Sequence, residues 1–468
     1  MRYAIIGAGL AGLTAAYELR CQDPSATIDV FEATERIGGK LLTVPFNSGP
    51  VDLGAEAFLA RNTSAYQFFS EELGLTTVTP SGLPSSVYSQ GTLQPLPHAG
   101  MMGIPATSEP IRDLISAESA HRIDHETEGS PIMWRRGQDM SVGRLVRQRY
   151  GDDVVDRLVS ALLGGVYSCS ADDLGIRATI PQLAEIFDDM CDADEPIFLS
   201  TAISRLLERR AQAAGSAQQA GTGQGSVFAA FPGGYADVYE TLAEKSRAAI
   251  YVDAFLTGLR RSEGKYQLIG AGEGSYDRVV IATPAPTAAL LLGSIAPEAA
   301  HLINTIKLAG SVVVGMKFDS DRGLPHNSGI LVAADQPGIR AKAFTLSSRK
   351  WPHLAKRGGA VVRASFGRYR DEALVRAEED NLVDYALDDL AQITGFDGRK
   401  AGLSEIYVQR WFGGIPVFDE HILATVAGVK TALQEVENLE VTGAWMAGVG
   451  VPAVVADARA AAVRLAQG

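Results

Sequence analysis

Residues 3–12, YAIIGAGLAG, begin with a short apolar run and continue directly into a glycine-rich turn. The run is typical of a buried parallel strand, and residues 13–19, LTAAYEL, have helical composition. In such a strand–turn–helix unit Gly7 makes the tight turn, Gly9 lets a pyrophosphate approach the backbone, and Gly12 lets helix and strand pack closely. We therefore expect a dinucleotide to bind at the helix N-terminus, where free N–H groups and the helix dipole favour anions.

A second apolar run, residues 28–31, ends in Glu32, which follows Gly12 by twenty residues. This is the spacing expected of an acid that binds the ribose hydroxyls, and a carboxylate at this position disfavours NADP. The alternative for Glu32 is a solvated carboxylate at the end of a strand. Together the two runs predict an α/β fold with a Rossmann-type dinucleotide-binding domain.

The composition limits the class of protein. With 468 residues the chain exceeds the roughly 250–300 residues that one hydrophobic core organises, so we expect two or three domains. The formal net charge of −13 does not provide the positive field that nucleic-acid binding requires. Three cysteines without C-x-x-C spacing suit a reducing compartment, and a glycine motif this close to the start leaves no room for a signal peptide. We therefore expect a cytoplasmic protein that does not bind nucleic acid.

Two short segments after Glu32 narrow the cofactor. Residues 35–40, ERIGGK, resemble the R-x-G-G-[RK] segment of FAD-binding amine-oxidase-type flavoproteins, and residues 52–56, DLGAE, resemble the D-x-G-x-x segment that passes close to the flavin in that family. An ordinary turn is the alternative for the glycine pair. The resemblance implies FAD as the cofactor and adds five cofactor-binding residues: Arg36, Gly39, Lys40, Gly54 and Glu56.

The C-terminal end predicts a second half of the same site. Residues 441–452, VTGAWMAGVGVP, are a short strand that leads into a glycine-rich turn, and residues 453–465 have helical composition. In the flavoprotein family this unit returns to the first domain and covers the flavin. The resemblance therefore adds Gly448, Val449 and Gly450 as cofactor contacts, together with Leu256 near the adenine and Trp411. A helix that packs on a sheet without a ligand is the alternative.

Internal segments make the resemblance more specific. Residues 162–168, LLGGVYS, and 174–183, LGIRATIPQL, are similar to a signature of the porphyrinogen oxidases of haem synthesis. The runs at 93–97 and 103–105, and the pattern of Arg410, Trp411, Pro416 and His421, resemble that family as well. The sequence departs from it at Cys169-Ser170, Ala458 and residues 452–455. A buried, inert thiol is the favoured interpretation of Cys169.

The resemblance implies an FAD-dependent oxidase that takes coproporphyrinogen III to coproporphyrin III, passes six electrons to oxygen and forms hydrogen peroxide. Three hydride transfers to the flavin suffice, so no catalytic side chain is expected, and the sequence has no triad or metal-ligand spacing. Arg61 and Arg177 are the candidates for the substrate carboxylates, with surface arginines as the alternative. Protoporphyrinogen oxidation remains open, as do a flavin amine oxidase, a carotenoid desaturase and a flavoprotein without enzymatic activity.

The predicted architecture has three parts. The FAD-binding domain is built from both chain ends, residues 1–60 with 228–298 and 402–468; residues 61–210 form a helical insertion beside the substrate, and 299–401 an α+β substrate domain. Residues 211–227 consist almost entirely of Ala, Gly, Ser, Thr and Gln, which predicts a mobile loop. The expected partners are the porphyrinogen and oxygen. Loose membrane association and contact with the next haem-pathway enzyme remain open.

Overall fold

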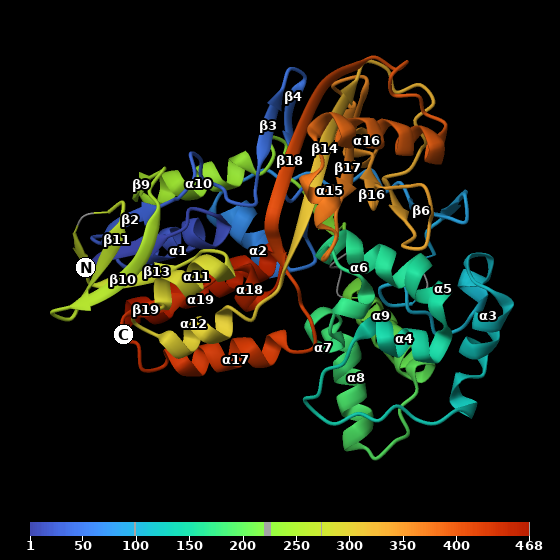
Figure 1. The fold of residues 1–468 in the computed structure, drawn as a ribbon, viewed down its shortest axis with the longest axis horizontal. Helices are drawn as coiled ribbons and strands as arrows, with labels where there is room; N and C mark the ends of the chain where they lie inside the picture. The colour runs from blue at the N-terminus through green and yellow to red at the C-terminus, as the bar shows by residue number, and fades with distance from the viewer. Residues whose placement is uncertain (98–99, 220–225, 273, 468) are drawn as a thin grey trace.

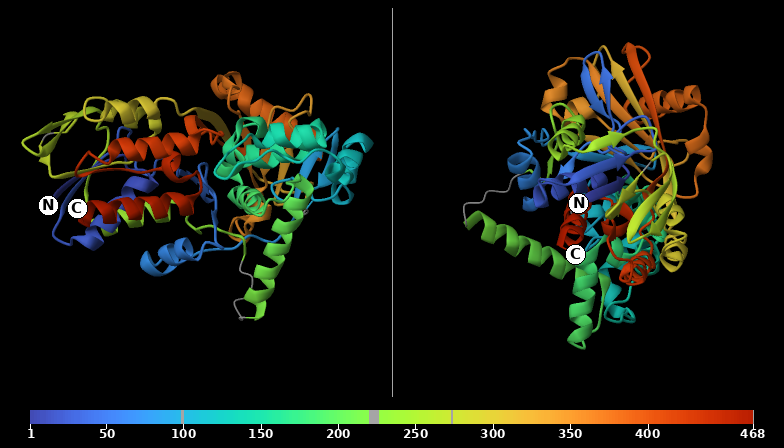
Figure 2. Two further views of the ribbon diagram at one scale, coloured as in Figure 1. Left: turned by 90° about the horizontal axis from the view of Figure 1, so that it is seen from below. Right: turned by 90° about the vertical axis from the view of Figure 1, so that its left-hand side faces the viewer.

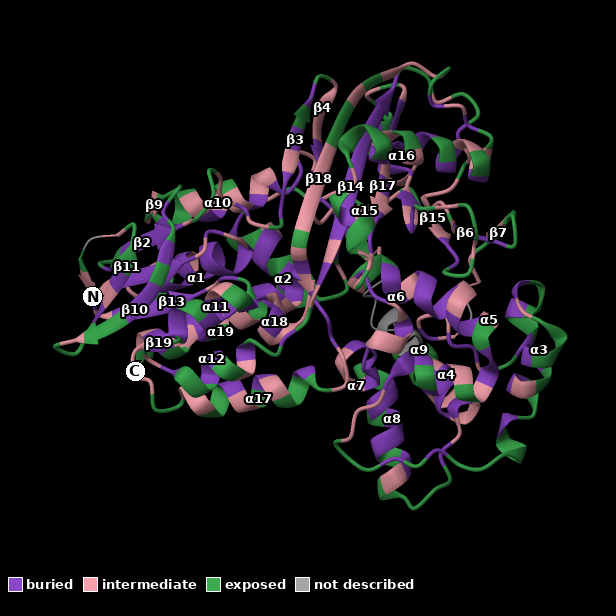
Figure 3. Cartoon of the chain, viewed as in Figure 1, coloured by how far each residue is buried: buried purple, intermediate pink, exposed green. Residues whose placement is uncertain are grey.

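The fold is known from a computed structural model that describes residues 1–97, 100–219, 226–272 and 274–467, without the side chains of 214–219. Three regions are visible in Figure 1: a region containing both termini, a region around the long strands β14 (Leu308–Phe318) and β18 (Leu403–Pro416), and a helical region that includes α4 (Val142–Tyr150) and α8 (Pro181–Asp192). Buried residues follow the strands and the inner faces of the helices in all three (Figure 3).

The first region is built on a five-stranded parallel sheet that both ends of the chain complete. The glycine-rich turn follows its central strand, β1. Because every connection between these strands crosses over the sheet, segments more than 400 residues apart in sequence become neighbours. In spatial order the strands are β19 (Leu439–Val441), β13 (Arg278–Ile281), β1 (Arg2–Ile6), β2 (Thr27–Phe31) and β9 (Ala249–Tyr251).

Alternation along these strands separates two apolar cores. Tyr3, Ile5 and Val30 belong to a core with the helices α1 (Leu10–Gln22), α10 (Ala236–Ser246) and α19 (Val451–Gln467). Ala4, Ile6 and Phe31 belong to a core on the other face. That face is covered by β10 (Leu256–Ser262), β11 (Lys265–Gly270), β12 (Ser275–Tyr276), α11 (Ala285–Leu292), α12 (Pro297–Ile303) and α17 (Ile422–Leu433).

A seven-stranded sheet forms the second region. Its order is β18, β14, β17 (Ala360–Phe366), β16 (Ala343–Thr345), β15 (Gly329–Val332), β6 (Ser85–Ser89) and β7 (Thr92–Pro95), and only the β15–β6 pair is parallel. One face packs on α15 (Glu372–Arg376) and α16 (Glu379–Thr394). The other face packs, through Val313 and Val361, on the hairpin of β3 (Thr43–Phe46) and β4 (Gly49–Asp52).

Helices make up most of the third region. Its shorter members are α3 (Ala117–Asp124), α5 (Asp152–Val154), α6 (Ser160–Tyr167) and α7 (Ile176–Thr179), and its longest is α9 (Leu199–Gln219). Figure 2 shows that α9 projects from the body of the protein. Two π-helical turns, at Phe68–Glu72 and Val155–Val159, interrupt the regular helices. The remaining short elements are α2 (Thr63–Gln67), α13 (Ser347–Lys350), α14 (Pro352–Ala355), α18 (Ala444–Ala447), the pair β5 (Phe58–Leu59) and β8 (Phe228–Ala229), and 3₁₀ turns at Glu109–Leu114, Glu126–Glu128 and Ala171–Asp173.

Three elements differ from the predicted architecture. The prediction of a loop over 211–227 is wrong for 211–219, which continue α9 because Ala and Gln are good helix formers, while 220–225 lie outside the described residues. The hairpin β6–β7 lies within the predicted helical insertion but belongs to the seven-stranded sheet. Strand β18 belongs to that sheet as well, although the predicted boundary assigns it to the cofactor domain. None of the helices that the structure describes is long and apolar enough to span a membrane.

The contact between the glycine-rich turn and α1 leads to a stability prediction. A Cβ atom on Gly12 would lie 1.9 Å from the Gly7 carbonyl oxygen, so Gly12→Ala forces the helix away from the sheet. We expect this variant to lower the free energy of unfolding by about 1–3 kcal/mol, measured by urea denaturation. The control Gly293→Ala has helical backbone angles and meets no atom closer than 3.4 Å, so its effect should stay within about 0.5 kcal/mol. Equal losses in the two variants would contradict the packing argument.

Candidate cofactor and active site

The glycine-rich turn presents open backbone at the start of α1. Gly7 has φ +103°, and a Cβ there would lie 2.6 Å from the carbonyl oxygen of Ala282 at the end of β13. Gly9 caps α1 without a side chain, and the first intrahelical bond is donated by the Leu13 N–H to the Gly9 carbonyl at 3.0 Å. The N–H groups before Leu13 therefore remain available, and no acidic residue lies in the first turn. This arrangement suits a pyrophosphate.

Glu32 lies beside this turn at the end of β2. One carboxylate oxygen accepts a hydrogen bond from the Ala8 N–H at 2.9 Å, and the other accepts from the N–H and the hydroxyl of Thr34, both at 2.9 Å. A freely solvated carboxylate does not fit these contacts. Each oxygen retains acceptor capacity, so the same group can also bind ribose hydroxyls.

The segment around Gly38 and Gly39 packs against the turn. Both glycines have positive φ, at +98° and +58°, and a Cβ on Gly39 would lie 2.9 Å from the Gly9 Cα. The guanidinium of Arg36 donates to the carbonyls of Gly39 at 2.7 Å and Leu41 at 3.2 Å, so it stabilises the loop from within.

Lys40 differs from Arg36 because its amine is free. The side chain is exposed, and within the described ranges it has no hydrogen bond or ion pair. The surrounding protein atoms nevertheless desolvate the amine, which lowers the pKa of Lys40 to about 8. A free cation next to the glycine-rich turn suits an anionic cofactor.

The segment at Gly54 and Glu56 connects this loop to the seven-stranded sheet. A Cβ on Gly54 would lie 2.0 Å from the Lys40 carbonyl oxygen. The Glu56 carboxylate accepts from the Ser347 hydroxyl at 2.6 Å and the Lys350 amine at 2.8 Å, and it lies 3.5 Å from the Arg363 guanidinium. Burial opposes ionisation of Glu56, but the two cations and the hydrogen bonds outweigh it and lower the pKa to about 2.

The remaining predicted cofactor residues approach the same place from distant parts of the chain. The Trp411 indole N–H donates to the Leu53 carbonyl at 3.2 Å, and the Arg36 guanidinium lies 6.0 Å from its ring centre. Leu256 is buried two residues after Ala254, whose N–H donates to the Glu32 carbonyl at 2.8 Å. The turn at 448–450 follows α18 and precedes α19, which packs on the same side of the parallel sheet as α1.

One face of the seven-stranded sheet is only partly covered. Ala343, Thr345 and Ser365 are half-buried in adjacent positions of β16 and β17, where Ala343 pairs with Ser365 and Thr345 with Arg363. Leu331 of β15 continues this face, and its Cδ2 lies 3.5 Å from the Cβ position of Gly165 in α6. This face therefore lies between the Gly54 segment and the L-L-G-G-V-Y run, where a substrate next to the cofactor has room.

Arg61 and Arg177, the predicted substrate arginines, differ in their contacts. Arg177 donates through Nη2 to Asp188 and through Nε to the Gln138 carbonyl, at 2.8 and 2.9 Å, which favours the structural alternative. Arg61 is exposed between β5 and α2 and has no polar partner in the described part of the chain. The structure thus leaves Arg61 as the only one of the two with free donors.

Cys169, where the sequence departs from the family, is fully buried. Its thiol lies 3.3 Å from the Tyr167 carbonyl, and burial raises the pKa of Cys169 to about 12. A thiol of this kind is unreactive. The neighbouring Ser170 caps the turn at Ala171–Asp173, so the departure leads to a locally well-formed structure.

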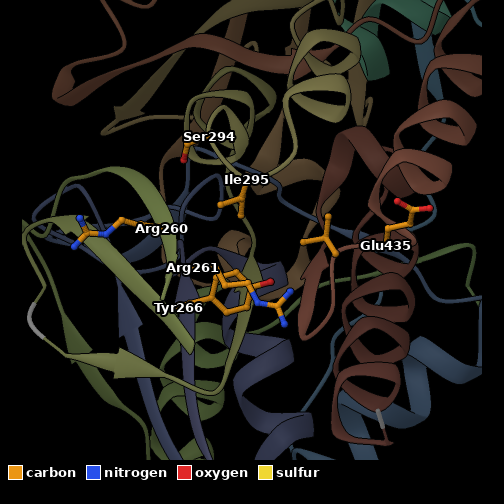
Figure 4. Close-up of a pocket in the computed structure, with 7 residues that line it drawn as sticks. Arg260, Arg261, Tyr266, Ser294, Ile295 and Glu435 are labelled. Carbon is orange, nitrogen blue, oxygen red and sulfur yellow. The ribbon is translucent and has the colours of Figure 1, made fainter. Parts of the chain in front are cut away.

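Sequence reasoning missed Lys350 and Arg363, the partners of Glu56. Each is a single cation in a segment without a motif, about 300 residues after Glu56, so no local signal indicates the contact. A separate pocket of about 330 Å³ lies between β10, β11 and the end of α17, and none of the predicted site residues lines it. Figure 4 shows Arg260, Arg261, Tyr266, Ser294, Ile295 and Glu435 around it.

The ion pairs of Glu56 predict how stability depends on pH. The folded-state pKa of Glu56 is about 2 against an ordinary value of 4.5, so its contribution is complete above about 4.5 and is lost as the pH falls toward 2. Glu56→Gln leaves Lys350 and Arg363 without their anion and should cost about 3–5 kcal/mol at pH 7, measured by urea unfolding. The gap between the variant and the parent should narrow below pH 4.5. A gap that stays constant down to pH 3 would contradict the assignment.

Comparisons with known proteins agree with this geometry. Residues 10–466 match the family model of flavin containing amine oxidoreductases. The chain is 36% identical over 460 residues to coproporphyrinogen III oxidase of Mycobacterium tuberculosis, which covers 97% of this chain and 95% of that protein.

Two solved structures share the fold. A crystal structure from Exiguobacterium sp. 255-15, provisionally assigned as a protoporphyrinogen oxidase, has a TM-score of 0.84 at 25% identity and covers 100% of this chain and 98% of its own. Cyclohexylamine oxidase from Brevibacterium oxydans has a TM-score of 0.68 at 16% identity, with the same coverage, and shows the fold alone. The chain thus belongs to the family of flavin containing amine oxidoreductases and is a flavin-dependent oxidoreductase.

Proposed function

We propose that this protein is an FAD-dependent oxidase that converts coproporphyrinogen III to coproporphyrin III in haem biosynthesis. The observation that carries the proposal is the 36% identity to a coproporphyrinogen III oxidase across nearly the full length of both chains. The L-L-G-G-V-Y run supports it, because these residues form α6, which borders the partly covered face of the seven-stranded sheet.

The cofactor is FAD, and the chain supplies residues for each of its parts. The free N–H groups of α1 and the Lys40 amine would hold the phosphates, and Glu32 the ribose. Gly54 and the turn at 448–450 would approach the flavin. Close backbone contacts at Gly7, Gly12, Gly39 and Gly54 leave no room for side chains there, as binding of a flat cofactor against backbone requires.

The chemistry needs orientation more than an acid or base from the protein. Coproporphyrinogen loses six electrons and six protons, and three molecules of oxygen become three of hydrogen peroxide. FAD, when bound, accepts two electrons as a hydride in each of three rounds and passes them to oxygen. The protein binds the macrocycle, holds a bridge carbon against the cofactor and limits water there.

The proposed division of labour follows the three regions. The parallel-sheet region holds FAD, and the seven-stranded sheet with α6 presents the substrate. Protoporphyrinogen oxidation is the second candidate, favoured by the TM-score of 0.84 to the Exiguobacterium structure. The two substrates differ in carboxylate number, four against two, so their relative turnover separates the candidates.

The proposal is tested by steady-state assays of the purified holoenzyme with both porphyrinogens, followed by porphyrin fluorescence. We expect a higher kcat/KM for coproporphyrinogen III, with about three oxygen molecules consumed per porphyrin formed. A preference for protoporphyrinogen would establish the second candidate. Absence of fluorescence from either substrate, with flavin bound and reducible by dithionite, would exclude both.

The assignment of Glu32 is tested by Glu32→Ala. Loss of this acceptor should weaken FAD binding by about 1.5–3 kcal/mol, since a charged hydrogen-bonding partner disappears. FAD released on dilution, measured by the recovery of free-flavin fluorescence, gives the affinity. Glu35→Ala, which removes an exposed neighbouring carboxylate, is the control and should leave retention unchanged. Equal FAD retention in both variants would remove Glu32 from the site.

A further inference from the structure

Two cations beside the end of α6 have no carboxylate in contact. Lys342 immediately precedes β16 and is 3% exposed. Its amine donates to the Ser168 hydroxyl at 2.6 Å and to the Gly367 carbonyl at 2.8 Å, both of them neutral oxygens. Its positive charge is therefore solvated by dipoles alone.

Arg368 has still fewer contacts. It follows the end of β17 by two residues, its Nε is buried without an acceptor, and within the described part of the chain its guanidinium makes no hydrogen bond or ion pair. The Nε lies 3.7 Å from the position of a Cβ on Gly164, so the guanidinium lies against the L-L-G-G-V-Y run. The residue as a whole is only partly buried, so a ligand can reach it.

Nearby carboxylates are committed elsewhere or lie too far away. Asp173 lies 3.9 Å from Arg370, and Asp419 pairs with Lys307 at 2.7 Å. Asp371 raises the pKa of both cations from a distance, but it has no ion pair within 4 Å. Desolvation dominates and lowers the pKa of Lys342 to about 7, and the neighbouring charge of Arg368 adds to this effect.

An arrangement of this kind costs stability in the absence of an anion. A buried charge without a partner is unfavourable, and two like charges near each other add to the cost. A carboxylate bound to the arginine fork would remove both penalties, because it can accept two parallel hydrogen bonds and neutralise the pair. The location between α6 and the partly covered sheet face places that carboxylate where the substrate is expected.

We propose that Arg368 binds a propionate carboxylate of the porphyrinogen and that Lys342 strengthens this site through its charge. The inference rests on the proposed function and deepens it, because it names the group that the protein recognises on the substrate. Arg368 replaces Arg177 in this role. The single arginine fits one carboxylate of the macrocycle and thereby fixes its rotation against the cofactor.

The experiment compares Arg368→Leu with Arg376→Leu in the FAD-loaded protein. Arg376 is an exposed arginine of the same connection, 3.6 Å from Glu372, and is the matched control. The ligands are coproporphyrin III and its tetramethyl ester, titrated by fluorescence. Arg368→Leu should weaken the free acid on the order of 10- to 100-fold and leave the ester unchanged. Arg368→Lys should recover part of the affinity, and the control should match the parent.

A thermal readout separates binding from a structural role. Removal of an uncompensated cation should leave the melting temperature of ligand-free Arg368→Leu unchanged or raise it, whereas removal of a structural arginine would lower it. A lower melting temperature with unchanged affinity for the free acid would overturn the inference, as would equal losses for acid and ester.

Failure of the proposed function is distinguishable from failure of the inference. If the parent oxidises coproporphyrinogen and Arg368→Leu binds coproporphyrin as the parent does, the inference alone fails. If the parent binds coproporphyrin in an Arg368-dependent way but oxidises no porphyrinogen, the proposed function alone fails. A parent that neither binds nor oxidises the macrocycle would refute both.

Discussion

Close contact between backbone segments is the constraint on which this structure depends. Gly12 lies against the Gly7 carbonyl, Gly39 against Gly9, and Gly54 against the Lys40 carbonyl, each at a separation that a side chain would prevent. Since Gly7 also meets Ala282 at the end of β13, one small volume joins segments from residues 7 to 282. The parallel order of β19, β13, β1 and β2 then brings the C-terminal turn to the same edge. The cofactor site is thus a consequence of how tightly these backbones can pack.

Local charge, more than net charge, determines what this acidic protein can bind. The formal charge of −13 is spread over the surface and screened within about 8 Å. Glu56, by contrast, directly contacts Lys350 and lies 3.5 Å from Arg363, and these contacts join the flavin-side segment to the substrate sheet. Lys40 has no carboxylate partner within the described ranges, so its charge remains available to an anion. The same chain therefore contains cations that stabilise the fold and cations free to bind a ligand.

Local motifs explain which parts of the fold the sequence could predict. The strand, turn and helix at residues 2–22 depend on neighbours within a few residues, and the structure confirms them as β1 and α1. The hairpin β6–β7 was missed because its edge position depends on β15, more than 200 residues later. The contacts of Glu56 with Lys350 and Arg363 were missed for the same reason, since only the folded sheet brings them together.

Side-chain roles were harder to predict than positions, because residue type does not reveal which donors are already used. Arg36, Arg177 and Arg368 all occur in or beside segments that resemble a family signature or the folded sheet that faces it. The first donates to carbonyls of its own loop, the second to Asp188, and the third to no acceptor in the described part of the chain. An arginine whose donors are satisfied must break those bonds before it can bind a ligand, whereas an unsatisfied one gains by binding. The residues most available for recognition are therefore those whose hydrogen bonds the fold leaves incomplete.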